Sequence, residues 1–534
     1  MTSSLIIGSG PAAAGVAIAL SRHRDEQITV IDIGARLSAH KRSIVNRLAS
    51  IPSSEWSNGE IAAIRPETVR SGRRSLPEKR SYGSDYPFRD VGQLRGLRAV
   101  EGTNRSVISG AYGGFSTVWG AQIMPLSAAM FAEWPVSLAQ MEPHYRAILS
   151  HIPFTAEQDD LARDFPLFGK PKPLPPLHPR TTMVLGAYER HRDRMKSFGI
   201  TLGHARLAMN SGGCISCGLC LTGCPHSLIY SASQTFDELI ARRRVAYHDG
   251  LIAYRLSESG GRARVDTWQA EANSARTFEA DRIYVACGAF GTTRLVLASL
   301  ERYDQPVLLE ESVQFVLPAL SAKRTPDPRS VNSFTLNQFN MVVSLDDAGQ
   351  SLSQVHFYSP DPAYLDAMPG PLRTHAARPA ALRLLRHITL GLGYLPSWAS
   401  PRLRGVVRRP QRPDLLPGFE IGPADSQPGD IPMLREVLRR MTRAAPYLDL
   451  LPVRAMRFVS ASGKSYHFGG SFPHARLHGG GYLSTDQVGR LKPWRRIHLV
   501  DGSVFPSIPA STFTLTVMAN AHRIAEDSVV LRDG

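Results

Sequence analysis

The first part of the chain limits the fold most strongly, because it places an apolar strand, close glycines and a helix in one order. Residues 5–7 are an apolar run, and Gly8 then allows a tight turn. Gly10 lets the backbone approach a pyrophosphate, and Ala13 is small enough for a helix to pack on the strand. The small apolar residues to about Leu20 predict a buried helix whose N-terminal amides face phosphates.

A second apolar strand, residues 28–31, is followed directly by an acidic residue, Asp32. It comes about 20 residues after the glycines, where a carboxylate accepts hydrogen bonds from a ribose diol. An acid here argues against NADP but does not distinguish FAD from NAD. A glycine-rich turn in another kind of α/β protein is the alternative, and it leaves Asp32 unexplained. The order of elements therefore predicts a dinucleotide-binding α/β domain.

Length and charge restrict the class of protein further. The 534 residues predict two or three domains. The net charge of +16 is spread along the chain without an arginine-rich helix or an aromatic-basic pattern, so we expect a solvated basic surface and no nucleic-acid partner. The first strand begins close to Met1 and no apolar run reaches the ~18 residues of a membrane span. We therefore expect a cytoplasmic protein with, at most, peripheral membrane contact through a basic, apolar helix over residues 380–398.

Four of the five cysteines lie in one short segment with the spacing C-x2-C-x2-C-x3-C-P. This spacing is typical of ferredoxins and favours a [4Fe–4S] cluster over zinc, which more often uses two separated pairs. A loop without metal stays an alternative. Cys287 could replace the last cysteine, but it ends a strand that runs toward the nucleotide. The predicted metal ligands are therefore Cys214, Cys217, Cys220 and Cys224.

A second glycine-rich segment, residues 108–120, suits a backbone wrapped around a flat ligand, and a bent strand with packing glycines is the alternative. With the glycine fingerprint, several segments of the chain resemble the glucose–methanol–choline family of FAD-dependent oxidoreductases. They are Gly113–Gly120, Trp134-Pro135 with Glu142-Pro143-His144-Tyr145, Val285–Leu295, His498–Pro506 and Leu515–Ala521.

The resemblance implies an α/β fold with a discontinuous, Rossmann-like FAD-binding domain and an α+β substrate domain built on an antiparallel sheet. Alternating polar and apolar residues at 334–339 and 353–358 agree, since they predict half-buried strands. Residues 40–105 show little periodicity and predict a partly irregular loop. The implied division is FAD-binding parts at 1–150, 233–302 and 456–534, a connecting segment at 151–204, the cysteine loop at 205–232 and the substrate domain at 303–455.

The resemblance also implies the chemical groups. His467, in the turn Tyr466–Gly470, matches the family's catalytic base, and a turn-capping histidine is the alternative. Thr512 stands where the family has a second His or Asn. Members with covalent FAD have His where this chain has Val118, so the FAD should be bound non-covalently. The implied FAD-binding residues are Gly8, Gly10, Ala13, Asp32, Gly113, Gly114, Ser116, Asp501 and Gly502.

These features together predict a dehydrogenase that oxidises an alcohol or sugar hydroxyl by hydride transfer to flavin N5. No second glycine fingerprint follows a strand, so a separate NAD(P)H domain is not expected. Electrons would leave through the cluster to an unknown protein or quinone acceptor. A non-catalytic flavin and iron–sulfur protein for electron transfer or redox sensing is the alternative, as is an NAD-binding dehydrogenase.

Overall fold

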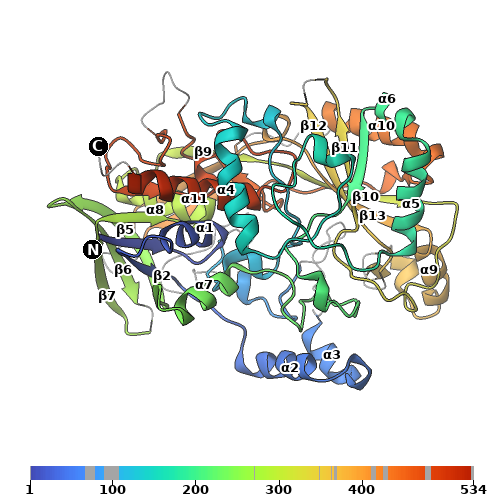
Figure 1. The fold of residues 1–534 in the computed structure, drawn as a ribbon, viewed down its shortest axis with the longest axis horizontal. Coiled ribbons are helices and arrows are strands. Elements are labelled where there is room, and N and C mark those ends of the chain that lie inside the picture. The colour runs from blue at the N-terminus through green and yellow to red at the C-terminus, as the bar shows by residue number, and fades with distance from the viewer. Residues whose placement is uncertain are drawn as a thin grey trace.

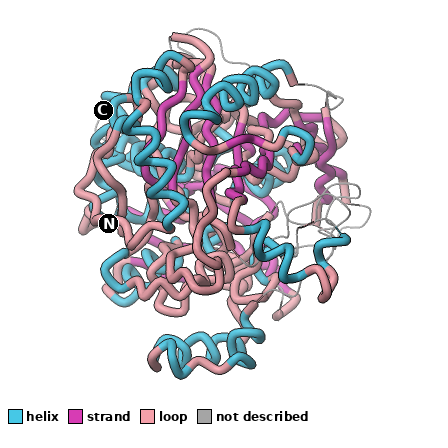
Figure 2. The backbone as a smooth tube through the Cα atoms, turned by 90° about the vertical axis from the view of Figure 1, so that its right-hand side faces the viewer, coloured by secondary structure: helices cyan, strands magenta, loops and turns pink. Residues whose placement is uncertain are grey.

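Four β-sheets run through the described part of the molecule, and most helices lie outside them (Figures 1 and 2). One sheet is parallel and three are antiparallel. This is the mixture of sheets that the sequence predicted. The computed structural model describes residues 2–65, 79–88, 108–269, 271–347, 349–361, 364–365, 368, 370–410, 416–424, 431–475 and 483–530.

The parallel sheet joins the beginning, the middle and the end of the chain. Its strand order is β19–β8–β1–β2–β4, with β1 at the centre. Its strands are β1 (Thr2–Ile7), β2 (Glu26–Ile31), β4 (Val245–His248), β8 (Arg282–Val285) and β19 (Ile497–Leu499). The segments thus come from all three parts of the chain that the family resemblance assigned to FAD binding.

Helices α1 (Pro11–Leu20) and α11 (Thr514–Val530) pack against each other beside this sheet, and α4 (Leu138–His151) packs against α11 (Figure 1). The approach is closest at Gly15, where a Cβ atom would lie 2.3 Å from the carbonyl oxygen of Met518. Only glycine fits there, so the first and last helices of the chain are fixed together. The other elements of this half are α7 (Ala232–Ala241), α8 (Gly288–Ser299) and the antiparallel strands β5 (Leu251–Ser259), β6 (Arg262–Gln269) and β7 (Ser274–Ala280).

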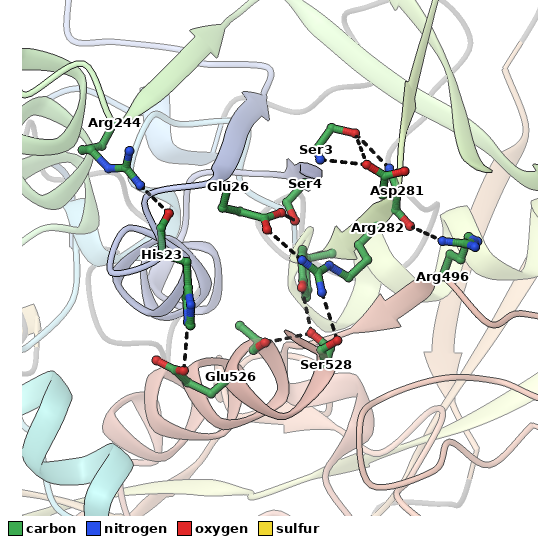
Figure 3. Close-up of polar contacts among 12 residues, drawn as sticks. Ser3, Ser4, His23, Glu26, Arg244, Asp281, Arg282, Arg496, Glu526 and Ser528 are labelled. Carbon is green, nitrogen blue, oxygen red and sulfur yellow. Dashed lines mark hydrogen bonds and ion pairs between the residues drawn. The ribbon is translucent and has the colours of Figure 1, made fainter. Parts of the chain in front are cut away.

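A polar cluster fastens the end of α11 to the amino ends of the parallel strands (Figure 3). The buried guanidinium of Arg282 donates to the Glu26 carboxylate at 2.8 Å and to the carbonyl of Ser528 at 3.0 Å. The hydroxyl of Ser4 donates to the same carboxylate. The amino edge of the sheet is therefore closed, which leaves the carboxyl edge for a ligand.

A larger antiparallel sheet forms the core of the second half, in the order β16–β10–β13–β12–β11–β3, with β17 also paired to β10. One face packs on α5 (Pro179–Arg190) and α10 (Pro432–Leu448) in an apolar core. Its strands are β3 (Ile200–His204), β10 (Gln314–Leu320), β11 (Phe339–Ser344), β12 (Leu352–Tyr358), β13 (Ile388–Tyr394), β16 (Leu451–Pro452) and β17 (Phe458–Val459). The segment 151–204 thus contributes β3 and α5 to this half.

The remaining sheet has the order β15–β14–β9–β18 and brings the segment of His467 next to β9. Two helices, α2 and α3, project from the rest of the molecule in both views (Figures 1 and 2). The strands of this sheet are β9 (Pro306–Glu311), β14 (Leu403–Arg408), β15 (Gly418–Pro423) and β18 (Phe468–Gly469), and the projecting helices are α2 (Ala39–Ser50) and α3 (Asn58–Ile64). Two further short helices are α6 (Arg192–Ser197) and α9 (Arg378–Leu385).

Three local predictions were wrong. Residues 380–398 are not one helix, because α9 ends at Leu385 and the chain then enters β13. Gly393 allows β13 to pair closely with β10, because a Cβ there would lie 2.1 Å from the Phe315 ring of that neighbouring strand. The predicted peripheral membrane contact therefore loses the helix on which it was based.

The other two corrections concern residues 334–338 and residues 40–64. Residues 334–338 were expected to be part of a strand, but they precede β11. Residues 40–64 contain α2 and α3 where an irregular loop was expected. Residues 66–78 and 89–105 of that loop lie outside the described part.

Among the described residues, no helix combines the length and the apolar character that a membrane crossing requires.

Candidate active site

The glycine turn after β1 has the backbone that the fingerprint requires. Gly8 has a φ of +104°, and a Cβ there would lie 2.6 Å from the carbonyl oxygen of Ala286. Gly10 is the N-cap of α1 and brings no side chain to the helix end. Ala13 is fully buried in the helix interface. The N-terminal amides of α1 are therefore free of a side-chain cap, which is the arrangement that binds phosphate oxygens.

The second glycine-rich segment lies directly on this turn. A Cβ at Gly114 would lie 3.1 Å from the Cα of Gly10, and the amide of Gly113 donates to the Ser9 hydroxyl at 2.9 Å. The Ser116 hydroxyl donates to the Gly113 carbonyl and accepts from the Ala232 amide at 2.9 Å. Two segments separated by a hundred residues thus form one backbone-lined cradle.

Asp32 lies at the carboxyl end of β2 beside that cradle. Its carboxylate accepts hydrogen bonds from the Ile33 amide at 2.9 Å, the Tyr247 hydroxyl at 3.1 Å and the Ser9 hydroxyl. Burial raises the pKa of Asp32 to about 6, and these donors act in the opposite direction. The acid is thus fixed at the sheet edge where the sequence placed a ribose-binding group.

The C-terminal segment completes the edge through Asp501 and Gly502. Asp501 is buried and accepts from the Thr292 hydroxyl and from the Ser503 amide at 2.9 Å, while burial raises its pKa. The carbonyl of Gly502 accepts from the Gly470 amide at 3.0 Å. Ser503 is fully buried, and its side chain lies within hydrogen-bonding reach of the Asp501 carboxylate, where it acts against the rise in pKa.

His467 lies between aromatic rings next to this edge. Its ring stacks on Tyr394 at a centroid distance of 4.2 Å and meets the edge of Phe513 at 5.1 Å. The preceding residue, Tyr466, has a φ of +58° and contacts Phe115 of the glycine-rich cradle at 5.7 Å. The residue that precedes the predicted histidine thus contacts the glycine-rich segment of the N-terminal part.

The electrostatic environment keeps the His467 imidazole neutral. Burial lowers its pKa to about 3, and no charged group counteracts this. Its Nδ1 atom is buried and has no hydrogen-bond partner. A neutral imidazole with a free nitrogen is able to accept a proton or to bind a hydroxyl group.

A buried carboxylate, Glu311 of β9, holds the loop that carries His467. It accepts from the amide of Gly463, which lies 3.0 Å from each carboxylate oxygen, and from the amide of Ser465 at 3.4 Å. The Ser465 hydroxyl in turn accepts from the His467 amide at 3.1 Å, and the Ser312 amide donates to the His467 carbonyl at 3.0 Å. Burial raises the pKa of Glu311 to about 7. No sequence pattern indicated this residue, because it lies more than 150 positions before the loop.

Thr512 lies in the segment that closes over the large antiparallel sheet. Among the described residues, the hydroxyl of Thr512 and that of fully buried Ser511 have no hydrogen-bond partners. The backbone amide of Gln354 donates to the carbonyl of Ala510 at 3.2 Å. The next residue, Phe513, touches the His467 ring. The structure therefore brings Thr512 and His467 into one region, with polar groups of β12 beside them.

The cysteine loop forms a separate group, packed on α2 and α3 through Leu219. Burial raises the pKa values of Cys217, Cys220 and Cys224, to about 11 for Cys220, and the neighbouring cysteine charges add to the rise. The amide of Thr335 donates to the Cys220 sulfur at 3.4 Å. Yet within the described residues no group of three or more His, Cys, Asp or Glu side chains is arranged to hold a metal ion. The donor set fits an iron–sulfur cluster, but its present arrangement does not.

Cys287 lies elsewhere, at the carboxyl edge of the parallel sheet. Its sulfur faces the Ile7 carbonyl at 3.8 Å, and a Cβ on Gly8 would lie 3.7 Å from its Cα. Burial raises its pKa, and the charges of Asp501 and Asp32 raise it further. It is therefore a neutral thiol beside the glycine turn, away from the other cysteines.

No protein-family model and no curated protein sequence matches this chain. Solved structures do match it over nearly its whole length. Pyridoxine 4-oxidase from Mesorbium loti has a TM-score of 0.59 and 15% sequence identity, and the match covers 99% of this chain and 99% of that one. Two variants of formate oxidase from Aspergillus oryzae RIB40, whose structures concern FAD modification, have a TM-score of 0.59 and 13% identity, covering 100% of this chain and 98% of theirs.

At these sequence identities the matches establish the fold, and they do so from one end of the chain to the other. The described residues contain one parallel sheet and a large antiparallel sheet, the mixture that the sequence predicted. The chain therefore has the fold of pyridoxine 4-oxidase and formate oxidase, which agrees with the fold that the resemblance to the glucose–methanol–choline family implied.

Proposed function

We propose that this chain is an FAD-dependent oxidoreductase that oxidises a CH–OH group of a small alcohol or sugar, with His467 as the catalytic base. The observation that carries the proposal is the buried, neutral imidazole of His467, whose Nδ1 has no hydrogen-bond partner among the described residues and whose neighbour Tyr466 contacts Phe115 of the glycine-rich cradle. Two proteins of the same fold are named oxidases, and the structures of one concern FAD modification. The free cysteines suit a reducing cytoplasm.

The residues of the cradle fit FAD. The uncapped start of α1 suits the pyrophosphate, and Asp32 suits the ribose. Bound FAD supplies a hydride acceptor. The resemblance to the family implies non-covalent binding, since members with covalent FAD have His where this chain has Val118. The residues that would hold it are Gly8, Gly10, Ala13, Asp32, Gly113, Gly114, Ser116, Asp501 and Gly502.

The protein's own groups supply proton transfer and orientation. Neutral His467 accepts the proton of the substrate hydroxyl, and the Thr512 hydroxyl helps to orient the same group. The rings of Tyr394 and Phe513 fix the imidazole plane and keep water away from it. Because burial weakens imidazole as a base, the proton leaves the hydroxyl only as the carbonyl forms.

The first test removes the base. His467→Ala should still bind FAD, as judged by its visible absorbance, but flavin reduction by an alcohol or sugar under anaerobic conditions should slow by ~10²-fold or more. His474→Ala is the control, because that buried histidine has a partner for each ring nitrogen. Unchanged reduction in His467→Ala would refute the assignment, and purified protein without flavin bands would refute the cofactor.

We also propose that the cysteine loop holds a [4Fe–4S] cluster, with Cys214, Cys217, Cys220 and Cys224 as ligands. The spacing of the thiols and the amide donor at Cys220 support this, while their arrangement would have to tighten around the cluster. One-electron transfer to a protein or quinone acceptor then becomes available. Anaerobically purified protein should contain about four irons per chain, and zinc or no metal would contradict the cluster.

A further inference from the structure

Strand β12 buries polar side chains on one face and apolar ones on the other. Val355 and Phe357 belong to the apolar core under α5 and α10. Gln354 and His356 point to the opposite face, yet their exposed fractions are 0% and 2%. Polar residues at alternate positions normally face water. Here they lie inside the molecule, and the backbone amide of Gln354 donates to the carbonyl of Ala510, two residues before Thr512.

This polar face is the one next to His467. Tyr394 of β13 pairs in register with Gln354, so both side chains leave the same face of the sheet. The Tyr394 ring stacks on the His467 ring at 4.2 Å and lies 5.6 Å from the His356 ring. One aromatic ring therefore contacts the imidazole from the C-terminal segment and the imidazole from the sheet.

Two atoms of this face have no hydrogen-bond partner among the residues that the structure describes. The Nε2 of His356 and the Oε1 of Gln354 are both buried without a hydrogen bond. Among the described residues, the side-chain amide nitrogen of Gln354 reaches only the sulfur of Met124, at 3.5 Å, which is a weak acceptor. Each unpartnered buried polar atom costs about 1–3 kcal/mol. A group that satisfies both atoms would therefore be bound strongly.

We propose that His356 and Gln354 bind a second hydroxyl group of the substrate while the reacting hydroxyl is at His467. This rests on the proposed function, and it narrows the substrate class to polyhydroxylated compounds. A hydroxyl group can donate to the Gln354 oxygen, and the same or a neighbouring hydroxyl can accept from a neutral imidazole N–H of His356, so a polyol supplies the partners that both atoms need. A carboxylate would face the lone pairs of that oxygen, and a monohydroxylated hydrocarbon would leave both atoms unpartnered.

The test compares compounds that share a carbon skeleton and differ in hydroxyl number. The pairs are myo-inositol with cyclohexanol and D-sorbitol with 1-hexanol. Each is assayed by anaerobic flavin reduction and, independently of turnover, by the shift that it causes in the thermal unfolding midpoint. The variant is His356→Phe, which fills the space without a hydrogen bond. His474→Phe is the matched control, because His474 is also 2% exposed but has partners for both nitrogens.

We expect at least one polyol to reduce the flavin with a higher kcat/KM than its monohydroxylated partner and to raise the unfolding midpoint. In His356→Phe the kcat/KM for that polyol should fall about 10–100-fold, through KM more than kcat, and its thermal shift should disappear. The value for the monohydroxylated partner should stay within about threefold. His474→Phe can be less stable, but it should keep the preference for the polyol.

Three results would overturn the proposal. They are an equal or greater preference for cyclohexanol or 1-hexanol, an unchanged polyol preference in His356→Phe, and no thermal shift with either polyol. The first two leave the oxidoreductase function intact, since flavin is still reduced. Conversely, a polyol shift that depends on His356, without flavin reduction by any compound, would support the binding site and contradict the proposed reaction.

Discussion

Two buried polar clusters at different places in the molecule differ in how completely their atoms are paired. At the amino edge of the parallel sheet, Glu26, Arg282 and Ser4 satisfy one another, and among these fully described side chains only the Nε of Arg282 lacks a partner (Figure 3). In the site, His467 and His356 each keep a buried nitrogen without a partner. Unpaired buried atoms cost free energy, so they persist where a ligand supplies the missing partner.

The difference separates polar groups that hold the fold together from those that bind a ligand. The paired cluster ties Ser528, near the end of α11, to the strands and faces no open edge. The unpaired cluster lies between the sheet of the second half and the segment that contains Thr512. Substitutions in the first should therefore change stability with little effect on turnover, and substitutions in the second should do the reverse.

The largest effect on stability should come from breaking the pair of Arg282 and Glu26. Arg282→Met leaves the Glu26 carboxylate buried with only the Ser4 hydroxyl, which should cost about 3–5 kcal/mol of unfolding free energy. The double variant Glu26→Leu with Arg282→Met removes both charges and should recover most of the loss. Thermal unfolding measures both, and turnover per folded molecule should not change. A single variant as stable as the parent would contradict the assignment of this cluster to stability.

Glu311 combines features of the two clusters. Its own carboxylate oxygens are hydrogen-bonded, but the loop that it holds carries His467, whose Nδ1 has no partner among the described residues. Glu311→Gln replaces one acceptor oxygen by a donor facing the Gly463 and Ser465 amides, and should cost about 1.5–3 kcal/mol. We expect a lower unfolding midpoint and a fall in kcat of about tenfold, since the His467 loop loses its anchor. A fall in stability with unchanged kcat would show that Glu311 holds the fold but does not position His467.

The sequence predicted the nucleotide-binding half well, because its constraints are local to the backbone. A φ of +104° at Gly8 and the space at Gly15 leave glycine as the only residue that fits. The two strands and the helix of the fingerprint lie where they were expected. At such positions the residue type alone indicates the local backbone structure.

The second half was predicted less well, because its features depend on distant contacts. Alternation at 353–358 identified strand β12 but predicted a solvent-facing side for Gln354 and His356, since the segment that covers them comes 150 positions later. The spacing of leucines at 382–390 suits a helix, yet Gly393 is there to make room for Phe315 in a strand. The spacing of apolar residues alone did not distinguish a helix from a strand in this segment.

A pair of histidines outside both clusters gives the expected pH dependence of stability. The Nδ1 atoms of His144 and His522 lie 3.0 Å apart, so one ring donates and the other accepts, and the two rings cannot both be protonated without losing this hydrogen bond. Burial lowers the pKa values of the two rings from 6.5 to about 4 and about 3. Between pH 6.5 and 4 the unfolded chain therefore binds protons that the folded chain does not, and stability falls as the pH falls.

The expected slope is about 1.4 kcal/mol per pH unit for each such histidine. Urea unfolding midpoints at pH 7.5 and pH 5 would measure it. His144→Asn should lose less stability than the parent between pH 7.5 and pH 5, because one of the two protons that only the unfolded chain binds is removed. An acid sensitivity that is the same in the variant would show that this pair does not contribute.

The smallest effect on stability should come from removing a single unpaired hydroxyl. Thr512→Val keeps the shape of the side chain and deletes an oxygen that has no partner, so the unfolding midpoint should stay the same or rise slightly. The matched control is Thr516→Val, because the Thr516 hydroxyl is buried and bonded to the Tyr145 hydroxyl at 2.7 Å. That change should cost about 1–2 kcal/mol. If Thr512→Val loses as much stability as Thr516→Val, its hydroxyl is paired in solution, and pairing no longer separates the two kinds of buried polar group. If it loses none while KM for the substrate rises, the absence of a partner within the protein marks the atoms that the substrate binds.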